Sequence, residues 1–353
     1  MNTIMGLINM QEDGSLIREL ADRRAVESIP FAGRYRLIDF ALSSMVNSGI
    51  HKVGVMLPDE PRSVLDHLRS GKDWDLARRH DGLFYLPAAP DETQQRKGDL
   101  KNFYHNLDFI EHASADYILL ANGSFVYNVD FDKVLRFHQN TGADITLVSH
   151  TTEDENTGSN VVIETAENGL ILDITEKPVA YEGMKVSMGV YLMEKDAFVE
   201  CVRYAYEHGG QSFLLDGIIR RAANYTMFAY AHDGYMAHVD SMSTYYRANM
   251  EILDPSVWEE LFMGERPIYT KIKDGVPVQY KDTAKVENSI LFRGVTVGRG
   301  VKIRNSIIMQ KCDIQNGALV ENVICDKNVV ITADKWLKGA MEYPLVICKN
   351  ATI

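Results

Sequence analysis

The last quarter of the chain repeats every 17 residues, and this regularity restricts the fold more than any other feature of the sequence. From Val286 the chain reads VENSILFRGVTVGRGVK, then IRNSIIMQKCDIQNGAL, then VENVICDKNVVI. Apolar residues fall into columns, one of which comprises Val286, Ile303 and Val320. A fixed period with apolar residues in register indicates structural repeats that stack on one another.

Each repeat is expected to form one coil of a parallel β-helix. Apolar residues recur about every second position, as in short strands, and near-hexapeptide steps fit a coil with three sides. Asn288, Asn305 and Asn322 form a further column, which we expect to build a side-chain ladder at one corner. A β-sandwich made of hairpins is the alternative, but it gives no reason for so regular a register.

The first two thirds of the chain alternate between strand and helix patterns. Strands are expected at residues 52–57, 117–121, 144–149 and 187–193. Helices are expected at residues 62–68, 102–113, 131–140, 197–207 and 214–223. This alternation predicts an α/β fold with a mostly parallel sheet. Because ligands bind beyond the carboxyl ends of such strands, the loops after Ile8, Ala121 and Met193 are the places to search.

The N-terminal stretch has the architecture of a phosphate loop without its chemistry. Thr3–Ile8 is typical of a strand, and a helix is expected to begin at Leu16. A phosphate loop needs several glycines so that the backbone can approach the anion, but only Gly14 is present. Glu12 and Asp13 place two negative charges where an anion would sit. The loop is therefore poorly suited to nucleotide phosphates.

The length, net charge and cysteine content of the chain exclude several classes of protein. A chain of 353 residues exceeds one ordinary core, so two domains are expected. The net charge of −12 argues against a general nucleic-acid-binding protein. No apolar run approaches about 18 residues, so we expect neither a membrane span nor a signal peptide. The four cysteines lack metal-ligand spacing, which favours reduced thiols in a cytoplasmic protein.

Proline and glycine pairs suggest where the two domains join. Asp254-Pro255, Arg266-Pro267 and the segment Gly275–Pro277 should each interrupt a helix or strand, and a helix at residues 242–253 precedes them. We therefore expect a first domain at residues 1–262, a connector at 263–283 and the β-helix at 284–353.

Two segments carry a resemblance to a known family. Ile29–Phe40 reads IPFAGRYRLIDF and Val46–Ile50 reads VNSGI, similar to the P-F-G-G-x-Y-R-I-I-D-F and N-S-G-I signature of bacterial glucose-1-phosphate adenylyltransferase (ADP-glucose pyrophosphorylase). Further matches follow in the family's order, at Gly71–Leu76, Glu176–Pro178, Ser187–Tyr191, Gly234–Tyr235 and Tyr246–Asn249. The resemblance spans essentially the whole chain. It implies a Rossmann-like nucleotidyltransferase domain, a left-handed β-helix, a role in glycogen synthesis and a tetramer.

The nucleotide loop of this family is not preserved here. The family's G-G-x-G-[ST]-R-L corresponds to residues 11–17, so that Gln11 and Glu12 stand at glycine positions and Leu16 replaces the arginine that would bind phosphates. Val26 replaces a basic residue of the family's A-K-P-A-V segment. A G-T-A-D-A segment near the nucleotide is represented by Lys97–Lys101.

The two carboxylates that hold Mg²⁺ in the family are also replaced. Ser124 stands for the aspartate of S-G-D-H, and His238 for that of W-x-D-[IV]-G-T. Mg²⁺ prefers hard oxygen ligands, and phosphoryl-group chemistry depends on such charge neutralisation. A structural role is the alternative for His238. Metal binding by Asp240 or Asp130 would rescue the site and stays open.

These departures resemble the non-catalytic GlgD-type regulatory subunit that some Gram-positive bacteria make beside a catalytic subunit. The resemblance then implies a chain without catalytic residues, cofactor or metal, with Mg²⁺ only in the catalytic glucose-1-phosphate adenylyltransferase partner of a heterotetramer. One alternative is an active sugar-nucleotide pyrophosphorylase with a divergent loop. Another is a hexapeptide-repeat acyltransferase, although the tail is short and lacks an obvious catalytic histidine.

Two groups of residues are candidates for sugar-phosphate binding. By correspondence with the family, the substrate contacts are Glu176, Lys177, Ser187 and Gly189. For the first two, a solvated ion pair before a proline turn is the alternative. Arg34 and Arg36 suit bidentate phosphate binding, and the family places sugar-phosphate effectors beside this segment. The alternative pairs these arginines with nearby carboxylates on an exposed surface.

Overall fold

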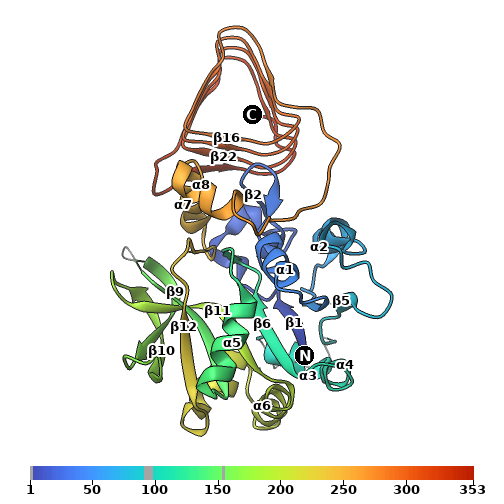
Figure 1. The fold of residues 1–353 in the computed structure, drawn as a ribbon. Helices are drawn as coiled ribbons and strands as arrows, with labels where there is room; N and C mark the ends of the chain where they lie inside the picture. Colours follow the sequence, from blue (N-terminus) through green and yellow to red (C-terminus); the bar gives the residue numbers. More distant parts are fainter. Residues whose placement is uncertain (1–2, 91–97, 153–155) are drawn as a thin grey trace.

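The computed structural model describes residues 3–90, 98–152 and 156–353. It has two parts, an α/β domain and a three-sided β-helix that stands on one end of it (Figure 1). The expected fold class, an α/β domain with a mostly parallel sheet followed by a parallel β-helix, is confirmed. The last helix before the β-helix ends at Phe262, and the first strand of the coils is Gln279–Tyr280.

The core of the α/β domain is a nine-stranded sheet, counted over the described residues. Its main path runs β10-β9-β11-β6-β1-β4-β5, with β8 and β12 beside β11. The strands are β1 (Ile4–Asn9), β4 (Lys52–Met56), β5 (Gly82–Leu86), β6 (Tyr117–Asn122), β8 (Ile145–Thr151), β9 (Asn156–Thr165), β10 (Ile171–Ala180), β11 (Lys185–Glu194) and β12 (Met227–Ala231). Strands β6, β1, β4 and β5 are consecutive neighbours in the sheet and run parallel to one another.

Helices cover both faces of this sheet (Figure 1). The helices of this domain are α1 (Ile38–Asn47), α2 (Arg62–Leu68), α3 (Leu100–His105), α4 (Leu107–Glu111), α5 (Phe131–Thr141), α6 (Lys195–Glu207), α7 (Met242–Glu251) and α8 (Pro255–Phe262). The last two, α7 and α8, lie next to the β-helix and not on a face of the sheet. The helix expected at residues 102–113 is divided at Asn106, and that at 214–223 is a π turn followed by a 3₁₀ segment. Asp254-Pro255 separates two helices, as expected: α7 ends at Glu251, and α8 begins at Pro255 because proline fits the first helical position.

The direction of strand β11 shows that one of the three predicted ligand-binding loops is wrong. It runs antiparallel to β6, and Met193 at its carboxyl end pairs with Ile118 near the start of β6. The loop after Met193 therefore lies at the edge opposite the loops that follow β1 and β6. The apolar run revealed a buried strand, but strand direction depends on the connection between strands, which periodicity does not report. The start of β11, with Ser187 and Gly189, lies on the ligand side instead.

The helix expected from Leu16 does not form. Residues 14–28 contain three single 3₁₀ turns, Gly14–Leu16, Arg18–Leu20 and Val26–Ser28, and the first α-helix is α1. Arg18 adopts a left-handed backbone conformation with φ of 50°, which interrupts any continuous helix there. The segment therefore has no helix N-terminus that could hold a phosphate, because short 3₁₀ turns present no run of aligned amides.

The β-helix consists of three parallel sheets with a register of 17 residues, as the sequence predicted. One sheet contains β14 (Gln279–Tyr280), β17 (Thr296–Val297), β20 (Asp313–Ile314) and β23 (Val330–Ile331). The second contains β15 (Lys285–Glu287), β18 (Lys302–Arg304), β21 (Leu319–Glu321) and β24 (Trp336–Lys338). The third contains β16 (Ile290–Leu291), β19 (Ile307–Ile308), β22 (Val323–Cys325) and β25 (Leu345–Ile347).

The asparagine column forms the predicted corner. Asn288, Asn305 and Asn322 all have positive φ, between 43° and 53°, a conformation that asparagine tolerates better than most residues. Asn288 Nδ2 donates to Asn305 Oδ1 at 2.7 Å, so the side chains of the first two coils form a ladder. In the next step Asn322 Nδ2 donates to the Gly339 carbonyl at 3.1 Å.

The third sheet is apolar on both of its faces, because it is covered on both. Ile308 and Cys325 point into the β-helix core, whereas Ile307 and Ile324 belong to a cluster with residues of the α/β domain. Phe31, Phe40 and Tyr245 are among their partners in that cluster. Tyr246 Oη also donates to the Asn305 carbonyl at 2.6 Å. The two domains therefore share one hydrophobic core at their junction.

None of the helices in the described ranges is long and apolar enough to span a membrane.

Ile307→Ala tests the shared core. Ile307 is fully buried between the two domains, so its truncation should lower the free energy of unfolding by about 2–5 kcal/mol. Leu319→Ala, on the outward face of another sheet, is the matched control and should change it by about 0.5 kcal/mol or less. Urea unfolding of both variants measures the difference, and equal effects would contradict the shared core.

Candidate functional site

Two loops meet where the order of the central strands reverses. Strands β4 and β5 lie on one side of β1, and β6 lies on the other. Asn9 at the carboxyl end of β1 pairs in register with Asn122 at the end of β6. In open α/β sheets this point of reversal is where ligands bind. The loops after Ile8 and Ala121, both predicted as ligand loops, are therefore neighbours.

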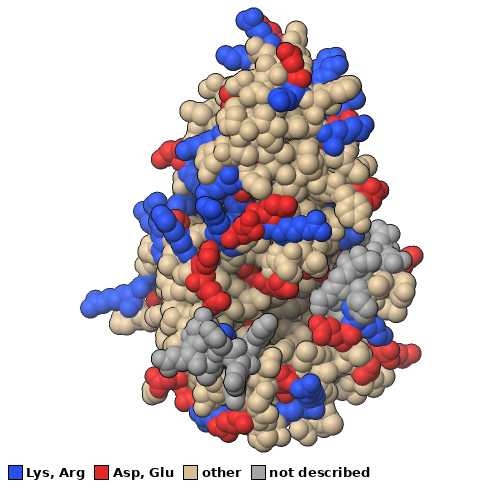
Figure 2. Space-filling view, turned by 180° about the vertical axis from the view of Figure 1, so that it is seen from behind, with Lys and Arg blue, Asp and Glu red and all other residues tan. Residues whose placement is uncertain are grey.

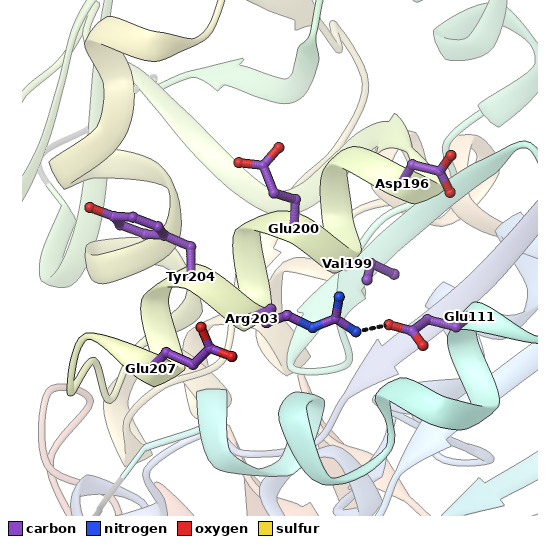
Figure 3. Close-up of a pocket in the computed structure, with 7 residues that line it drawn as sticks. All are labelled: Glu111, Asp196, Val199, Glu200, Arg203, Tyr204 and Glu207. Carbon is purple, nitrogen blue, oxygen red and sulfur yellow. Dashed lines mark hydrogen bonds and ion pairs between the residues drawn. The ribbon is translucent and has the colours of Figure 1, made fainter.

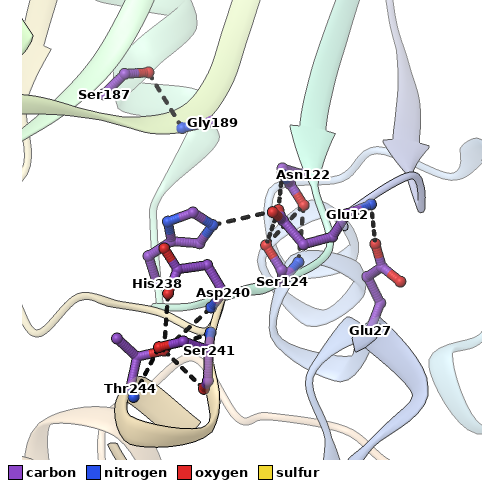
Figure 4. A network of polar contacts seen from close by, with 10 residues as sticks. All are labelled: Glu12, Glu27, Asn122, Ser124, Ser187, Gly189, His238, Asp240, Ser241 and Thr244. Atoms are coloured by element: carbon purple, nitrogen blue, oxygen red, sulfur yellow. Dashed lines mark hydrogen bonds and ion pairs between the residues drawn. The ribbon is translucent and has the colours of Figure 1, made fainter. Parts of the chain in front are cut away.

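Glu12, from the first loop, occupies this position with its side chain. Asn122 Nδ2 and Ser124 Oγ each donate to Glu12 Oε2 at 2.8 Å, and His238 Nε2 lies 3.3 Å from the same oxygen (Figure 4). An ionised carboxylate only accepts hydrogen bonds, so the histidine ring donates. We call these four residues the Glu12 site.

A small ribbon brings His238 to this site from a distant part of the sequence. β13 (Ala237–His238) pairs antiparallel with β7 (Phe125–Val126), which follows Ser124 directly. The His238 ring stacks on Phe125, with centroids 4.1 Å apart and an angle of 3° between the planes. The Val239 amide also donates to the Ser124 carbonyl at 3.1 Å. The imidazole is therefore held in one orientation.

The charges of the Glu12 site stabilise one another. Burial alone would raise the pKa of Glu12, but the hydrogen bond and charge of His238, with the donors Asn122 and Ser124, lower it to about 2. Burial alone would lower the pKa of His238, but its hydrogen bond to Glu12 and the charge of that carboxylate raise it. The contact is therefore an ion pair, with side chains that are only 12% and 15% exposed.

A second carboxyl group, Glu27, lies next to Glu12 without being charged. Burial and the negative charge of Glu12 raise the pKa of Glu27 to about 8. Its Oε1 accepts a hydrogen bond from the Glu12 amide at 3.2 Å, and its side chain is fully buried. Glu27 is thus a neutral acid that positions the backbone of Glu12. No sequence pattern indicates this role, because Glu27 cannot be distinguished by pattern alone from a surface carboxylate.

The residues of the Glu12 site do not fit Mg²⁺. Asn122 and Ser124 direct donors, not oxygen lone pairs, at the centre, and His238 brings a positive charge. Asp240, considered as a substitute ligand, is buried and accepts from Thr244 Oγ1 at the start of α7. Over the described ranges, no group of three or more His, Cys, Asp or Glu side chains is arranged to hold a metal ion.

Asp130, the other substitute considered, lies elsewhere. It accepts a hydrogen bond from the Asp132 amide at the start of α5 and pairs with Arg266 at 3.4 Å. The first contact is that of a helix N-cap, and the second is an ion pair with a residue of the connector.

Three further positions of the divergent loop and its neighbourhood do not join the site. Gln11 donates to the Leu57 carbonyl at 3.1 Å, which ties the loop to the end of β4. Leu16 is 58% exposed, so an arginine in its place would point to solvent in this loop conformation. Val26 is buried in the core shared with the β-helix. Of the segment Lys97–Lys101, Lys97 lies outside the described residues.

Asn122 and Asp99 belong to this region and were not predicted as single residues. Asn122 is the last residue of β6, and its Oδ1 accepts from the Ser124 amide at 3.0 Å. Asp99 accepts from Asn9 Nδ2 at 2.8 Å and from the Phe213 amide at 2.9 Å. A polar residue at the end of a buried strand was the available signal for Asn122.

The four sugar-phosphate candidates lie on two strands. Ser187 and Gly189 belong to β11, and in Figure 4 this strand passes above His238 of the Glu12 site. Ser187 Oγ accepts from the Gly189 amide at 3.2 Å. Gly189 has a φ of 65°, and a Cβ there would come within 2.9 Å of Asn122 and Phe125, so only glycine fits.

Glu176 and Lys177 lie on β10, at the edge of the sheet. Glu176 is exposed and Lys177 is half-buried. The segment is not a turn, as one interpretation held, because Pro178 lies within the strand, where the ladder to β9 shifts register. Proline is tolerated at such irregularities because it has no amide to donate.

Arg34 and Arg36, the effector candidates, are separated by the structure. Arg34 is exposed, 6.0 Å from the Tyr35 ring. Arg36 is buried and donates from Nη1 to the carbonyl and hydroxyl oxygens of Ser63, both at 2.8 Å, while its buried Nε has no hydrogen-bond partner. Arg36 also lines a cavity.

That cavity, of about 770 Å³, lies where the α/β domain meets the β-helix. Figure 2 shows lysine and arginine side chains gathered at this junction. We call it the cationic cleft, after its basic lining residues Arg23, Arg24, Arg36, Arg62, Lys327 and Lys349. Its acidic lining residues are Glu19, Asp22, Asp66 and Asp326, of which Asp326 pairs with Arg24.

The cations of the cationic cleft lie close enough together to lower one another's pKa values. Burial and the charges of Arg36, Arg24 and Lys273 lower the pKa of Lys327 to about 7. Burial lowers the pKa of Arg36 to about 10, with a further contribution from Arg24. A bound anion would relieve this repulsion.

Another cavity, of about 570 Å³, lies between α4 and α6 and has the opposite character (Figure 3). Its charged lining residues are Glu111, Asp196, Glu200, Arg203 and Glu207. Arg203 is already paired with Glu111. This cavity lies on the outer side of α6, away from the carboxyl ends of β1 and β6, and adds nothing to the site.

Comparisons with known proteins agree with this architecture. Residues 13–255 match a family model for nucleotidyl transferases, and residues 272–337 match a model described as GlmU-like, C-terminal hexapeptide. The chain belongs to the nucleotidyl transferase family. The first match alone covers well over half of the chain.

Individual relatives define the family further. The chain is 33% identical to the glycogen biosynthesis protein GlgD of Bacillus subtilis, over 99% of this chain and 96% of that protein. It is 36% identical to GlgD of Geobacillus stearothermophilus, over 90% and 83% respectively. A glucose-1-phosphate adenylyltransferase of Clostridium perfringens is 30% identical over 88% of this chain and 84% of that protein. These relatives support a role in glycogen biosynthesis.

Glu27→Gln tests the neutral acid beside Glu12. The pKa of Glu27 is about 8 in the folded protein, against an ordinary value of 4.5. The folded state keeps a proton that the unfolded chain releases, so this group makes the free energy of unfolding fall as pH rises between those two values. Glutamine cannot titrate and still accepts from the Glu12 amide, so the variant should lose this decline.

Urea unfolding across that pH range measures the effect. The stability of Glu27→Gln relative to the original protein should increase steadily with pH, whereas the exposed Glu19→Gln control should follow the original protein. Parallel pH profiles for Glu27→Gln and the original protein would show that Glu27 is ionised in the folded state.

Proposed function

We propose that this chain is a regulatory, catalytically deficient subunit of glucose-1-phosphate adenylyltransferase, the activity that converts ATP and glucose 1-phosphate to ADP-glucose and pyrophosphate. It acts by assembling with a catalytic paralogue in a heterotetramer. The observation that carries the proposal is the Glu12–His238 ion pair at the ligand-binding point of the sheet. This pair stands where the chemistry needs a metal ion and substrate phosphates.

The physical argument rests on charge. Attack of a sugar phosphate on ATP brings several negative groups together, and Mg²⁺ with basic side chains neutralises them. The Glu12 site offers an internal carboxylate instead, and its only cation, His238, is already paired. Ser124 and His238 cannot replace two carboxylates as Mg²⁺ ligands. The chain therefore carries no cofactor, and Mg²⁺ is bound by the catalytic partner.

The regulatory part of the proposal is based on the preserved fold of both domains around the inactive site. The domains share one core, and an inactive chain with a preserved fold acts through its interfaces. In an oligomer such a chain can shift the conformational equilibrium of its neighbours, by about 1–3 kcal/mol in typical allosteric systems. The cationic cleft supplies a place for an anionic effector, and a sugar phosphate is the class we propose.

The purified chain alone should form no ADP-glucose above background in an assay with ATP, glucose 1-phosphate and Mg²⁺. Added to the catalytic paralogue, it should form a mixed oligomer by native mass spectrometry and change the activity per catalytic chain or its effector response by roughly 5- to 150-fold. Turnover of the isolated chain at about 1–1000 per second would contradict catalytic deficiency. Separate homo-oligomers with unchanged kinetics would contradict the regulatory role.

The effector response of the mixed oligomer should depend on the cationic cleft. Lys327→Gln and Arg36→Gln remove cations from its lining and should weaken activation or inhibition by a sugar bisphosphate roughly tenfold or more. Arg34→Ala removes an exposed arginine nearby and serves as the matched control, with an unchanged response. Equal effects of the Arg34 and Arg36 substitutions would place the effector outside the cleft.

A further inference from the structure

The residues around Glu12 present hydrogen-bond donors, whereas a metal site presents oxygen or nitrogen lone pairs. Three donors, from Asn122, Ser124 and His238, converge on a single oxygen, Glu12 Oε2 (Figure 4). The donors are fixed by contacts of their own. Asn122 Oδ1 accepts from the Ser124 amide, which orients its NH₂ group toward Glu12, and the His238 ring lies flat on Phe125. These donors would bind any anion that took the place of the carboxylate.

Glu12 itself is less firmly held than its three donors. It lies in a stretch between β1 and the 3₁₀ turn that begins at Gly14, with neither helix nor strand. Its backbone makes one hydrogen bond, to Glu27, and its neighbour Asp13 is exposed. Rotation of the Glu12 side chain toward solvent would return its charge to water. The donors would remain in place because Asn122 ends β6, His238 belongs to β13, and Ser124 lies in the short turn between β6 and β7.

Exchange of Glu12 for an external anion conserves the charge balance. His238 keeps a negative partner, and the two neutral donors keep an acceptor, so no buried group is left unsatisfied. Phosphate is the anion that matches best, because it combines high charge with several acceptor oxygens and binds where the strand order of an α/β sheet reverses. Strand β11 passes close to these donors, because a Cβ at Gly189 would come within 2.9 Å of Asn122 and Phe125.

We propose that the Glu12 site is a metal-independent binding site for a phosphate group, with Asn122, Ser124 and His238 as its donors and Glu12 as an internal ligand that the phosphate displaces. The proposal rests on the proposed function only in that the site performs no Mg²⁺-dependent transfer. The phosphate belongs either to a sugar phosphate or to a nucleotide.

Calorimetric titration with inorganic pyrophosphate in EDTA tests this proposal. All proteins carry Lys327→Gln, which weakens binding in the cationic cleft. In this background Glu12→Ala should bind pyrophosphate roughly tenfold or more tightly than the protein with Glu12, because the internal competitor is gone. Adding His238→Ala should abolish the gain. Asp13→Ala, which removes the adjacent exposed carboxylate, is the matched control and should give no gain.

Three results would overturn the proposal: no gain from Glu12→Ala, an equal gain from Asp13→Ala, or a gain that requires Mg²⁺. Thermal unfolding verifies that each variant is folded, and Glu12→Gln, which keeps the side-chain volume, replaces the alanine variant if that one unfolds. Titrations with glucose 1-phosphate and with ATP, also in EDTA, distinguish the two sources of the phosphate. These results are independent of the activity measurements on the mixed oligomer, so either proposal can fail alone.

Discussion

The ion pair between Glu12 and His238 is the contact on which the functional character of this protein depends. It joins the loop after the first strand to a ribbon more than 200 residues later in the chain, and both side chains are largely buried. Burying two charges is costly unless they are paired and hydrogen-bonded. Here both conditions are met, because Glu12 is paired with His238 and also accepts hydrogen bonds from Asn122 and Ser124. The stacked Phe125 ring holds the imidazole in place. Protonated Glu27 prevents a second negative charge from accumulating beside the pair.

The junction of the two domains is the second organising feature. The β-helix sheet that faces the α/β domain carries isoleucines on its outer side, and these isoleucines pack with Phe31, Phe40 and Tyr245. The cationic cleft lies at the edge of the same junction, where Arg24 of the first domain pairs with Asp326 of the β-helix. An anion bound there would contact both domains at once. It would therefore act on their relative position, which is a property expected of a regulatory ligand.

The sequence predicted the features that depend on periodicity. The 17-residue repeat fixed the coils, the apolar columns and the asparagine corner, because stacked repeats transmit their register directly into the sequence. Short apolar runs located the buried strands for the same reason. Prediction from the sequence failed where the local structure depends on contacts between distant parts of the chain. The direction of β11 depends on its partners, and the helix expected from Leu16 was replaced by 3₁₀ turns around a left-handed Arg18.

At the site, the motif comparison named individual positions but did not indicate their interactions. Ser124 and His238 were recognised as replacements for metal ligands, yet the sequence did not indicate that Glu12 would take the place of the ligand itself. Arg34 and Arg36 are two residues apart, but one is exposed and the other lines the cleft. The positioning role of Glu27 depends on full burial, which no single-sequence pattern reports.

The central claim is that this chain contributes regulation and no chemistry, even inside an assembly. The most direct test uses a mixed oligomer in which the catalytic partner has lost one of its metal-binding carboxylates while this chain is unchanged. ADP-glucose synthesis should then fall to background, although native mass spectrometry still finds the mixed oligomer. Mg²⁺-dependent synthesis that persists in that oligomer, and disappears when Ser124 and His238 of this chain are replaced by alanine, would contradict the claim.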